Sequence, residues 1–270
     1  MPPLYAGMRA PSVVRLLAAA LLALIAVACK PSGPPPLVDD GMASCLTSDT
    51  LALAVADLDK LRGSPFVASL SGSARDLLAQ YGNDSKLLIA WNGRDLLIIR
   101  RGLFKTPPPG ATMIEPGLAA AGTPRRISAA LAQHRTGATG AFDLIRYGSQ
   151  IGAGRAVWLT VRGGTALPLS GNLANLNHLL EDATIAGAAL DLGEETYLRV
   201  DAEGRTADSA DRLEQRLRAL VSMAKEAEIH GPEIEQLLDG ASMARSGPEV
   251  TLTLSAPPDA VAKLLAGLAR

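Results

Sequence analysis

The stretch KLLIAWNGRDLLIIR, residues 86–100, carries the strongest prediction of local structure in this sequence. Two apolar runs, residues 86–91 and 95–100, flank the dipeptide Asn92-Gly93. This dipeptide is typical of a two-residue hairpin turn, because both turn positions favour a positive φ. The stretch therefore predicts two antiparallel strands joined by a tight turn, with Gly93 at a positive φ.

Strands and helices are predicted on both sides of this hairpin. Residues 50–56 form an apolar run typical of a buried strand, and Ser64-Pro65 predicts the start of a helix, since proline is favoured at the first helical position. Pro107-Pro108-Pro109 cannot continue a strand ladder and predicts an exposed connector. The other elements expected in this half are strands at 111–114 and 117–121 and helices at 124–133 and 142–147.

The second half of the chain, from about residue 152, repeats these parts in a similar order. The elements expected there are strands at 156–161, 184–192, 196–202 and 250–254 and helices at 171–180, 206–227, 233–238 and 258–268. We therefore predict an α+β fold of two related units, residues 49–150 and 151–270. Each unit is expected to be close to a split βαβ arrangement, with a mainly antiparallel sheet and helices on one face.

The composition of the 270 residues excludes several classes of protein. Hydrophobic residues make up 48% and charged residues 20% of the chain, so it can bury a core. Lys and Arg number 26 against 27 for Asp and Glu, which gives a formal net charge of -1. The chain therefore has no excess of positive charge of the kind that binds the phosphates of a nucleic acid. We therefore expect no nucleic-acid partner.

Residues 1–28 have the layout of an export signal. Arg9 and Arg15 precede an apolar run at 16–28, and no acidic residue occurs before Asp39. A helix that spans a bilayer needs about 20 apolar residues, and this run is shorter. A permanent transmembrane span is therefore disfavoured.

The end of the run, Ile25-Ala26-Val27-Ala28-Cys29, resembles the lipobox of bacterial lipoproteins, with Ala26 at the position usually held by Leu. The resemblance implies that residues 1–28 are removed as a lipoprotein signal peptide and that Cys29 carries fatty acids such as palmitate. The membrane is then one partner of the mature protein. The alternative is a plain secretory peptide cut near Ala28, with Cys29 an ordinary thiol.

Residues 29–48 are expected to form a Pro-rich tether. Three consecutive prolines in the segment 30–36 favour an extended chain without a core. In lipoproteins such segments hold the folded body away from the bilayer, and Lys30 directly after the Cys resembles the pattern that does not retain a lipoprotein at the inner membrane. We therefore expect a lipid-anchored protein of the bacterial cell envelope, facing the periplasm from the outer membrane where the organism has one.

The cysteine count agrees with this interpretation. The chain has two cysteines, Cys29 and Cys45. If Cys29 carries lipid, Cys45 has no intramolecular partner and the fold rests on its core alone. The alternative, a Cys29–Cys45 disulfide, requires an unlipidated chain.

Local signatures of catalysis and cofactor binding are absent from the sequence. The three histidines, His134, His178 and His230, are far apart and form no metal-ligand spacing. No GxSxG or GxxxxGK[ST] motif occurs, and Gly152-Ala153-Gly154 lacks the third glycine of the dinucleotide fingerprint. We therefore predict no catalytic residue, no cofactor and no metal ligand, and Cys29 is the one residue assigned a role.

Several polar and aromatic side chains have a structural and a functional interpretation. His178 follows Asn172, Asn175 and Asn177, and a small polar cluster of this kind can face a ligand-binding cleft. The favoured interpretation is that these residues lie on a solvated helix face. The acidic pairs Asp39-Asp40 and Glu194-Glu195 are expected to be solvated. The tryptophans Trp91 and Trp158 lie among aliphatic residues and are expected in core or edge packing.

The sequence favours a membrane-tethered envelope lipoprotein that acts as a non-catalytic binding or scaffolding module. Its second partner, beside the membrane, is an envelope protein or ligand that the sequence does not identify. Two alternatives stay open: an extracytoplasmic enzyme with a dispersed site, which leaves no local motif, and a carrier of an apolar ligand.

Overall fold

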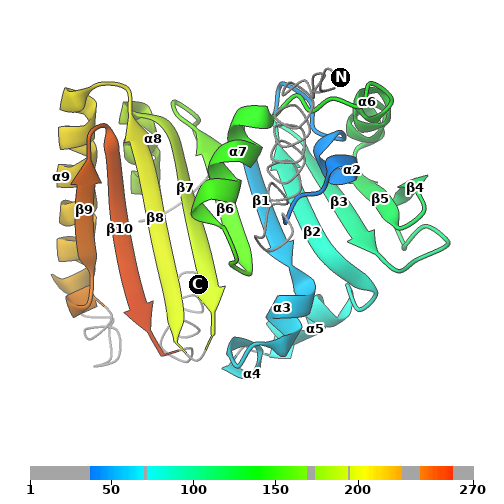
Figure 1. Cartoon of the computed structure of the whole chain (residues 1–270), viewed down its shortest axis with the longest axis horizontal. Helices are drawn as coiled ribbons and strands as arrows, with labels where there is room; N and C mark the ends of the chain where they lie inside the picture. The colour runs from blue at the N-terminus through cyan, green and yellow to red at the C-terminus, as the bar shows by residue number, and fades with distance from the viewer. Residues whose placement is uncertain (1–36, 70–71, 169–173, 194, 227–237, 258–270) are drawn as a thin grey trace, which may run out of the picture. The chain divides into compact units, whose positions relative to one another are not determined.

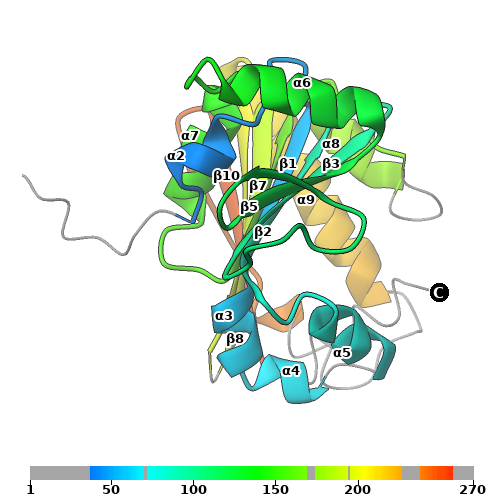
Figure 2. The same cartoon turned by 90° about the vertical axis from the view of Figure 1, so that its right-hand side faces the viewer.

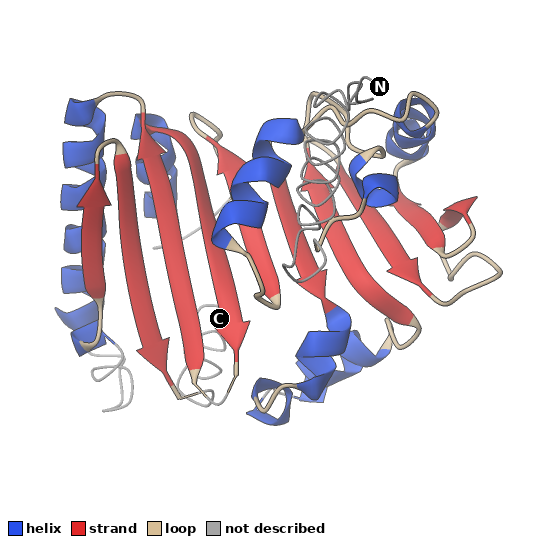
Figure 3. Ribbon diagram, viewed as in Figure 1, coloured by secondary structure: helices blue, strands red, loops and turns tan. Residues whose placement is uncertain are grey.

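A computed structural model describes residues 37–69, 72–168, 174–193, 195–226 and 238–257, and places their strands in one open ten-stranded sheet. The strand order is β4-β5-β3-β2-β1-β6-β7-β8-β10-β9 (Figures 1 and 3). Every pair of neighbouring strands is antiparallel. The predicted α+β class and the mainly antiparallel pairing are confirmed.

The elements have the following bounds. The strands are β1 Ala52–Asp57, β2 Asp84–Trp91, β3 Leu96–Gly102, β4 Thr112–Glu115, β5 Leu118–Gly122, β6 Val157–Arg162, β7 Ala183–Leu192, β8 Thr196–Gly204, β9 Ser242–Ser246 and β10 Glu249–Ala256. The helices are α2 Asp40–Ala43, α3 Leu58–Gly63, α4 Phe66–Ser69, α5 Gly72–Ala79, α6 Pro124–His134, α7 Phe142–Ile151, α8 Leu176–Asp182 and α9 Ala207–Glu226. The helices expected at 233–238 and 258–268 lie wholly or almost wholly outside the described residues.

The strands of the two predicted units join into a single sheet. β1 and β6 pair from Ala52 opposite Val161 to Ala56 opposite Val157, and α7 crosses the predicted boundary at residue 150. Both strands are apolar, and an unpaired edge strand would expose its N–H and C=O groups. Pairing the two strands satisfies those groups at the centre of the sheet.

Helices lie on both faces of the sheet. Figure 2 shows α2 and α7 on one side and α8 and α9 on the other. The first side buries the larger core, in which α2, α6 and α7 cover β1, β2 and β3. On the second side, Leu213 and Leu217 of α9 pack against β8 and β10. β7 contributes to both cores, because side chains alternate along a strand: Ile185 and Ala189 belong to the larger core, and Ala186 packs against the smaller one.

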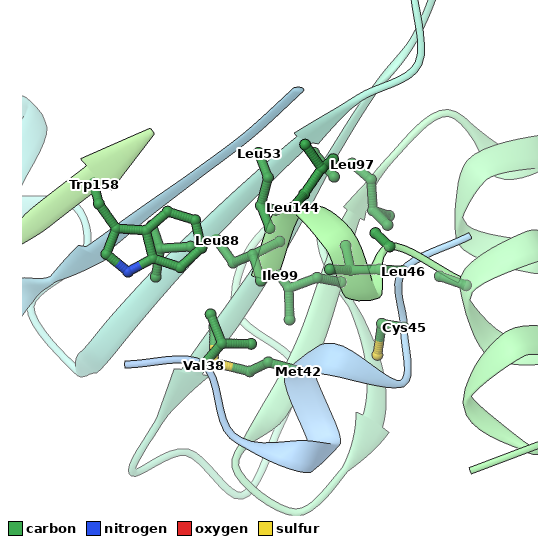
Figure 4. Close-up of a cluster of buried hydrophobic side chains, with 14 of the residues drawn as sticks. Val38, Met42, Cys45, Leu46, Leu53, Leu88, Leu97, Ile99, Leu144 and Trp158 are labelled. Carbon is green, nitrogen blue, oxygen red and sulfur yellow. The ribbon is translucent and has the colours of Figure 1, made fainter. Parts of the chain in front are cut away.

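Residues 37–48 belong to the folded core, so the predicted tether extends too far. Met42, Cys45 and Leu46 are 0% exposed, and Figure 4 shows them beside the strand residues of the larger core. Met42 is the buried residue of α2, and Cys45 and Leu46 follow the end of this short helix. The Asp39 side chain caps α2 by accepting a hydrogen bond from the Met42 amide at 2.9 Å. Residues 29–36 of the predicted tether lie outside the described residues.

The hairpin at 86–100 is confirmed, but its turn differs from the prediction. Gly93 has a φ of 91°, as expected. Trp91 pairs with Leu96, so the loop comprises residues 92–95 rather than two residues. Asn92 is not at a positive φ; its Oδ1 instead accepts hydrogen bonds from the amides of Arg94 and Asp95 at 3.2 and 2.9 Å. The Asn92 amide also donates to the Asp95 carbonyl at 3.4 Å, so side-chain and backbone bonds together close the turn.

We expect Gly93→Val to lower the free energy of unfolding by about 1 kcal/mol or more, because a β-branched residue is strained at a positive φ. Denaturant unfolding of the purified variant measures this loss. Gly63→Val is the matched control, since Gly63 has an ordinary φ and a Cβ added there would meet no atom within 4 Å. Equal stability of the two variants would contradict the assignment.

Candidate functional site

An open cleft of about 390 Å³ lies between α7 and the strands β8, β9 and β10. It is lined by Arg146, Tyr147, Gln150 and Ile151 of α7, by Arg199 and Glu203 of β8, and by Ser246, Pro248 and Glu249 of the β9–β10 hairpin. Figure 1 shows α7 in front of β6, with β8 and β10 uncovered beside it. The cleft therefore lies on the face opposite α9.

The alternation of β8 explains why this face is polar. Val200 and Ala202 pack against α9 in the smaller core. The alternate residues Arg199, Asp201 and Glu203 consequently point to the face that carries α7. Their cross-strand partners on β10 are also polar, with Thr251 opposite Asp201 and Glu249 opposite Glu203.

Arg199, which lines the floor of the cleft and is 35% exposed, forms an ion pair with the buried Asp201. The Asp201 side chain is 0% exposed, and its Oδ2 accepts a hydrogen bond from Arg199 Nε at 2.6 Å. Its Oδ1 accepts a hydrogen bond from Thr251 Oγ1 at 2.5 Å. The bond to Asp201 raises the pKa of Arg199, while burial acts in the opposite direction. Asp201 is thus a fully bonded carboxylate that fixes the Arg199 side chain.

Tyr147 lies against this floor with an unsatisfied hydroxyl. The residue is 9% exposed, and its Oη is buried without a hydrogen-bond partner among the described residues. Burial, followed by the negative charges of Asp201, Glu249 and Glu203, holds the pKa of Tyr147 well above its usual value. The phenol is therefore neutral, and it both donates and accepts hydrogen bonds.

Two charged residues of the cleft also lack partners in the described part of the chain. Neither Arg146, which is exposed on α7, nor Glu203, which is half-buried on β8, forms an ion pair there. Glu203 directly opposes Glu249 across the two strands, an arrangement of like charges that is unfavourable in a sheet. The cleft therefore presents unsatisfied charge of both signs.

A second cleft, of about 340 Å³, lies beside Asp84 and residues 107–109. Asp84 is buried, and its Oδ2 accepts from Arg100 Nε and lies close to Nη2, both at 2.8 Å. Arg100 in turn stacks over the Tyr81 ring at 4.9 Å. Asp84 Oδ1 is also buried without a hydrogen-bond partner among the described residues, and burial raises the pKa of Asp84. Arg100 nevertheless pairs directly with this carboxylate, so the cleft beside α7 is the stronger candidate.

A serine, a histidine and a carboxylate meet away from both clefts. Ser44 Oγ lies 2.7 Å from His134 Nδ1, and His134 Nε2 lies 3.7 Å from Glu115 Oε2. Ser44 is only 5% exposed, and its hydroxyl donates to the Gly41 carbonyl at 2.9 Å. A nucleophile needs access to substrate and a free base, so this group acts as a link between α2 and α6. No local pattern indicates this group, because its members are far apart in the chain.

Cys45 has no nucleophilic character in this setting. Its Sγ is buried, 3.3 Å from the Gly41 carbonyl and 3.9 Å from His134 Nδ1. Burial, with the Glu115 charge adding to it, raises the pKa of the Cys45 thiol to about 12. The thiolate needed for attack is therefore absent at neutral pH. Among the described residues no group of His, Cys, Asp and Glu has an arrangement that would hold a metal ion.

The polar residues singled out in the sequence have structural contacts. His178 is exposed and lies 3.3 Å from Glu181, and Asn177 makes two hydrogen bonds to the backbone of Leu167. Asp39, expected to be solvated, instead binds Arg101 at 2.7 Å. Glu194 and His230 lie outside the described residues, as does Cys29.

The two tryptophans pack as predicted. Trp158 is 1% exposed in the larger core, and Trp91 packs against a smaller cluster around Ala52 and Val161. The residues that line the cleft were not predicted as a site. The alternation of charge at Arg199 and Asp201 in the predicted strand 196–202, continued at Glu203 just after it, is the one signal that points to the cleft.

No helix in the ranges that the structure describes has both the length and the apolar character that crossing a bilayer requires. Comparison with protein-family models and with curated proteins finds no match. Among solved structures, the chain is similar in fold to crystal form IV of TP0453, with a TM-score of 0.50 and 10% identity over 87% of this chain and 98% of that one. Crystal form I of TP0453 gives a TM-score of 0.48 and 11% identity over 88% and 99%. At this identity the likeness concerns the fold alone.

Proposed function

We propose that this chain is a membrane-tethered lipoprotein of the bacterial cell envelope that acts as a non-catalytic binding module, and that the cleft beside α7 is its binding site. The observation that carries the proposal is that Tyr147 lines an open cleft and has a buried hydroxyl with no hydrogen-bond partner among the described residues. Leaving such a group unbonded costs about 1–3 kcal/mol. A ligand that bonds to it recovers that cost.

The chemistry of the lining supports binding rather than catalysis. The hydroxyl groups in the cleft belong to Tyr147 and Ser246, and neither histidine nor cysteine lines it. Arg199 is held by Asp201 and is not free to move a proton. The proposed anchor at Cys29 and the prolines at 31–36 would hold this site at a set distance from the membrane.

A thermal-shift screen of the mature lipidated protein in lipid nanodiscs tests the proposal. The probes are phosphate, succinate, putrescine, L-alanyl-L-alanine, O-phosphoethanolamine and glucose. A ligand at about 100 times its Kd adds about 2.7 kcal/mol to folding stability, so binding raises the unfolding midpoint. Gln150→Trp, at an exposed cleft residue of α7, is designed to fill the mouth, and Ser128→Trp on the exposed side of α6 is the size-matched control.

We expect at least one probe to stabilise the wild type and Ser128→Trp but not Gln150→Trp. If no probe distinguishes the blocked variant from the control, the cleft is not the binding site. Turnover of a hydrolase substrate panel that Gln150→Trp abolishes would instead establish the enzyme alternative.

A row of apolar side chains favours a second candidate function, a carrier of an apolar ligand. The strand register aligns six residues on the face opposite α7 across the middle of the sheet: Ile98, Ile89, Ala54, Leu159, Ala188 and Val200. Leu159 is 39% exposed within this row. Binding of dodecanoate that is lost in Leu159→Glu and retained in Gln150→Trp would favour this function over the cleft.

A further inference from the structure

We infer that the cleft beside α7 takes a small zwitterion, whose ammonium group lies between Tyr147 Oη and Glu203 and whose anionic group lies at Arg146. This inference rests on the proposed function, because it names the class of ligand for the same site. The cleft volume of about 390 Å³ is within the range of small-molecule pockets.

The floor of the cleft carries more negative than positive charge. Glu203 and Glu249 line the cleft from neighbouring strands, and Asp201 lies buried beside them. Arg199 is the basic residue that these strands contribute to the lining. Arg199 binds Asp201 closely, and its distance to Glu249 is 3.8 Å. Glu203 and its neighbour Glu249 therefore keep an excess of negative charge, which favours a cation.

The Tyr147 hydroxyl gives a second, independent indication of a ligand. The Tyr147 ring packs on Gly187 of β7, where a Cβ would lie 3.2 Å from ring atom Cε1. Gly187 is paired with Asp201, so the ring lies beside the acidic residues of β8. Its buried oxygen has no hydrogen-bond partner among the described residues, so it can accept a bond from an N–H donor.

An organic ammonium fits this arrangement better than a metal ion does. The described carboxylates are not gathered into a group that would coordinate a metal, whereas an ammonium group needs only directed acceptors. The three N–H groups of an organic ammonium can donate hydrogen bonds to the Tyr147 oxygen and to the Glu203 carboxylate.

Arg146 supplies the complementary end of the cleft. It lies one residue before Tyr147 and four before Gln150 on α7, so Arg146 and Gln150 share one face of the helix. Arg146 is exposed and has no ion pair in the described chain. Its guanidinium binds carboxylate or phosphate with two parallel hydrogen bonds. A ligand with both charges a few atoms apart satisfies Arg146 and Glu203 together.

Isothermal titration of the mature protein in nanodiscs tests this inference. The zwitterionic probes are L-alanyl-L-alanine and O-phosphoethanolamine. The probes with charge of one sign are putrescine, a cation, and succinate, an anion. We expect at least one zwitterion to bind, and we expect the Kd of putrescine and of succinate to be at least tenfold higher than the Kd of that zwitterion. Binding of the dipeptide alone indicates a peptide-type ligand, and binding of phosphoethanolamine alone indicates a head-group type; either result supports the inference.

Three substitutions are expected to weaken binding of that zwitterion. Glu203→Gln and Arg146→Gln each remove one charge and should raise the Kd roughly tenfold or more. Tyr147→Phe removes only the hydroxyl and should raise it about threefold to tenfold. Asp76→Asn on the exposed surface of α5 is the control, with an unchanged Kd. Glu203→Gln also relieves the repulsion with Glu249, so its unfolding midpoint should not fall.

The outcomes separate this inference from the proposed function. If succinate, putrescine or glucose binds in a way that Gln150→Trp blocks, while no zwitterion binds, the zwitterion inference is wrong and the binding function stands. If a zwitterion binds equally well to wild type, Glu203→Gln and Arg146→Gln, the assigned contacts are wrong. If no probe responds to Gln150→Trp, both proposals fail.

Discussion

The Cys29→Ala variant is expected to lose nearly all of its partitioning into the detergent phase when the protein is expressed in a bacterium that processes lipoproteins. Cys29 follows the lipobox-like residues 25–28, and several acyl chains on one residue anchor a protein stably where a single chain binds marginally. Phase separation of membranes in Triton X-114, followed by immunoblotting of both phases, measures the effect. Mass spectrometry of the mature N-terminus identifies the lipid.

Cys45→Ala is the matched control for this experiment. Cys45 is 0% exposed in the core beside α2, so its loss should leave the partitioning of the folded protein unchanged. The alternative, a Cys29–Cys45 disulfide in an unlipidated chain, predicts a water-soluble wild type with no free thiol after denaturation. Wild-type partitioning that persists in Cys29→Ala would show that attachment has another cause.

Local patterns predicted the strands and the longer helices because each depends on a few neighbouring residues. The hairpin at 86–100 combines two apolar runs with a polar turn, and α9 has apolar residues at helical spacing. The predicted length of the turn was wrong. The Asn92 side chain accepts hydrogen bonds from the amides of Arg94 and Asp95, and this gives a conformation other than the two-residue turn that Asn-Gly predicts.

Features that depend on long-range pairing escaped prediction. Nothing local to β1 or β6 shows that the two strands pair, because any apolar strand can pair with any other. The core role of Met42, Cys45 and Leu46 was hidden by the prolines that precede them. The cleft was missed for the same reason: Tyr147 and Glu203 meet only when α7 packs on β6 and β7.

The contact between α7 and β6 also predicts the largest loss of stability from a small substitution. We expect Gly148→Ala to lower the free energy of unfolding by up to about 3 kcal/mol. A Cβ at Gly148 would lie 2.2 to 2.6 Å from three ring atoms of Trp158, and a Cβ at Gly152 would lie 2.3 Å from the same ring. Trp158 is 1% exposed and lies against both glycines, so it has no room to move aside.

The sign of this effect is what distinguishes packing from helix propensity. Alanine is better than glycine within a helix by about 1 kcal/mol, so propensity alone predicts that Gly148→Ala stabilises the protein. Gly63→Ala, at a helical glycine with open space around it, should be neutral or stabilising in the same denaturant titration. In a Trp158→Phe background the smaller ring leaves room for the new methyl group, and the cost of Gly148→Ala should fall below about 1 kcal/mol. A cost that is unchanged in that background would show that Trp158 is not the residue that requires glycine on α7.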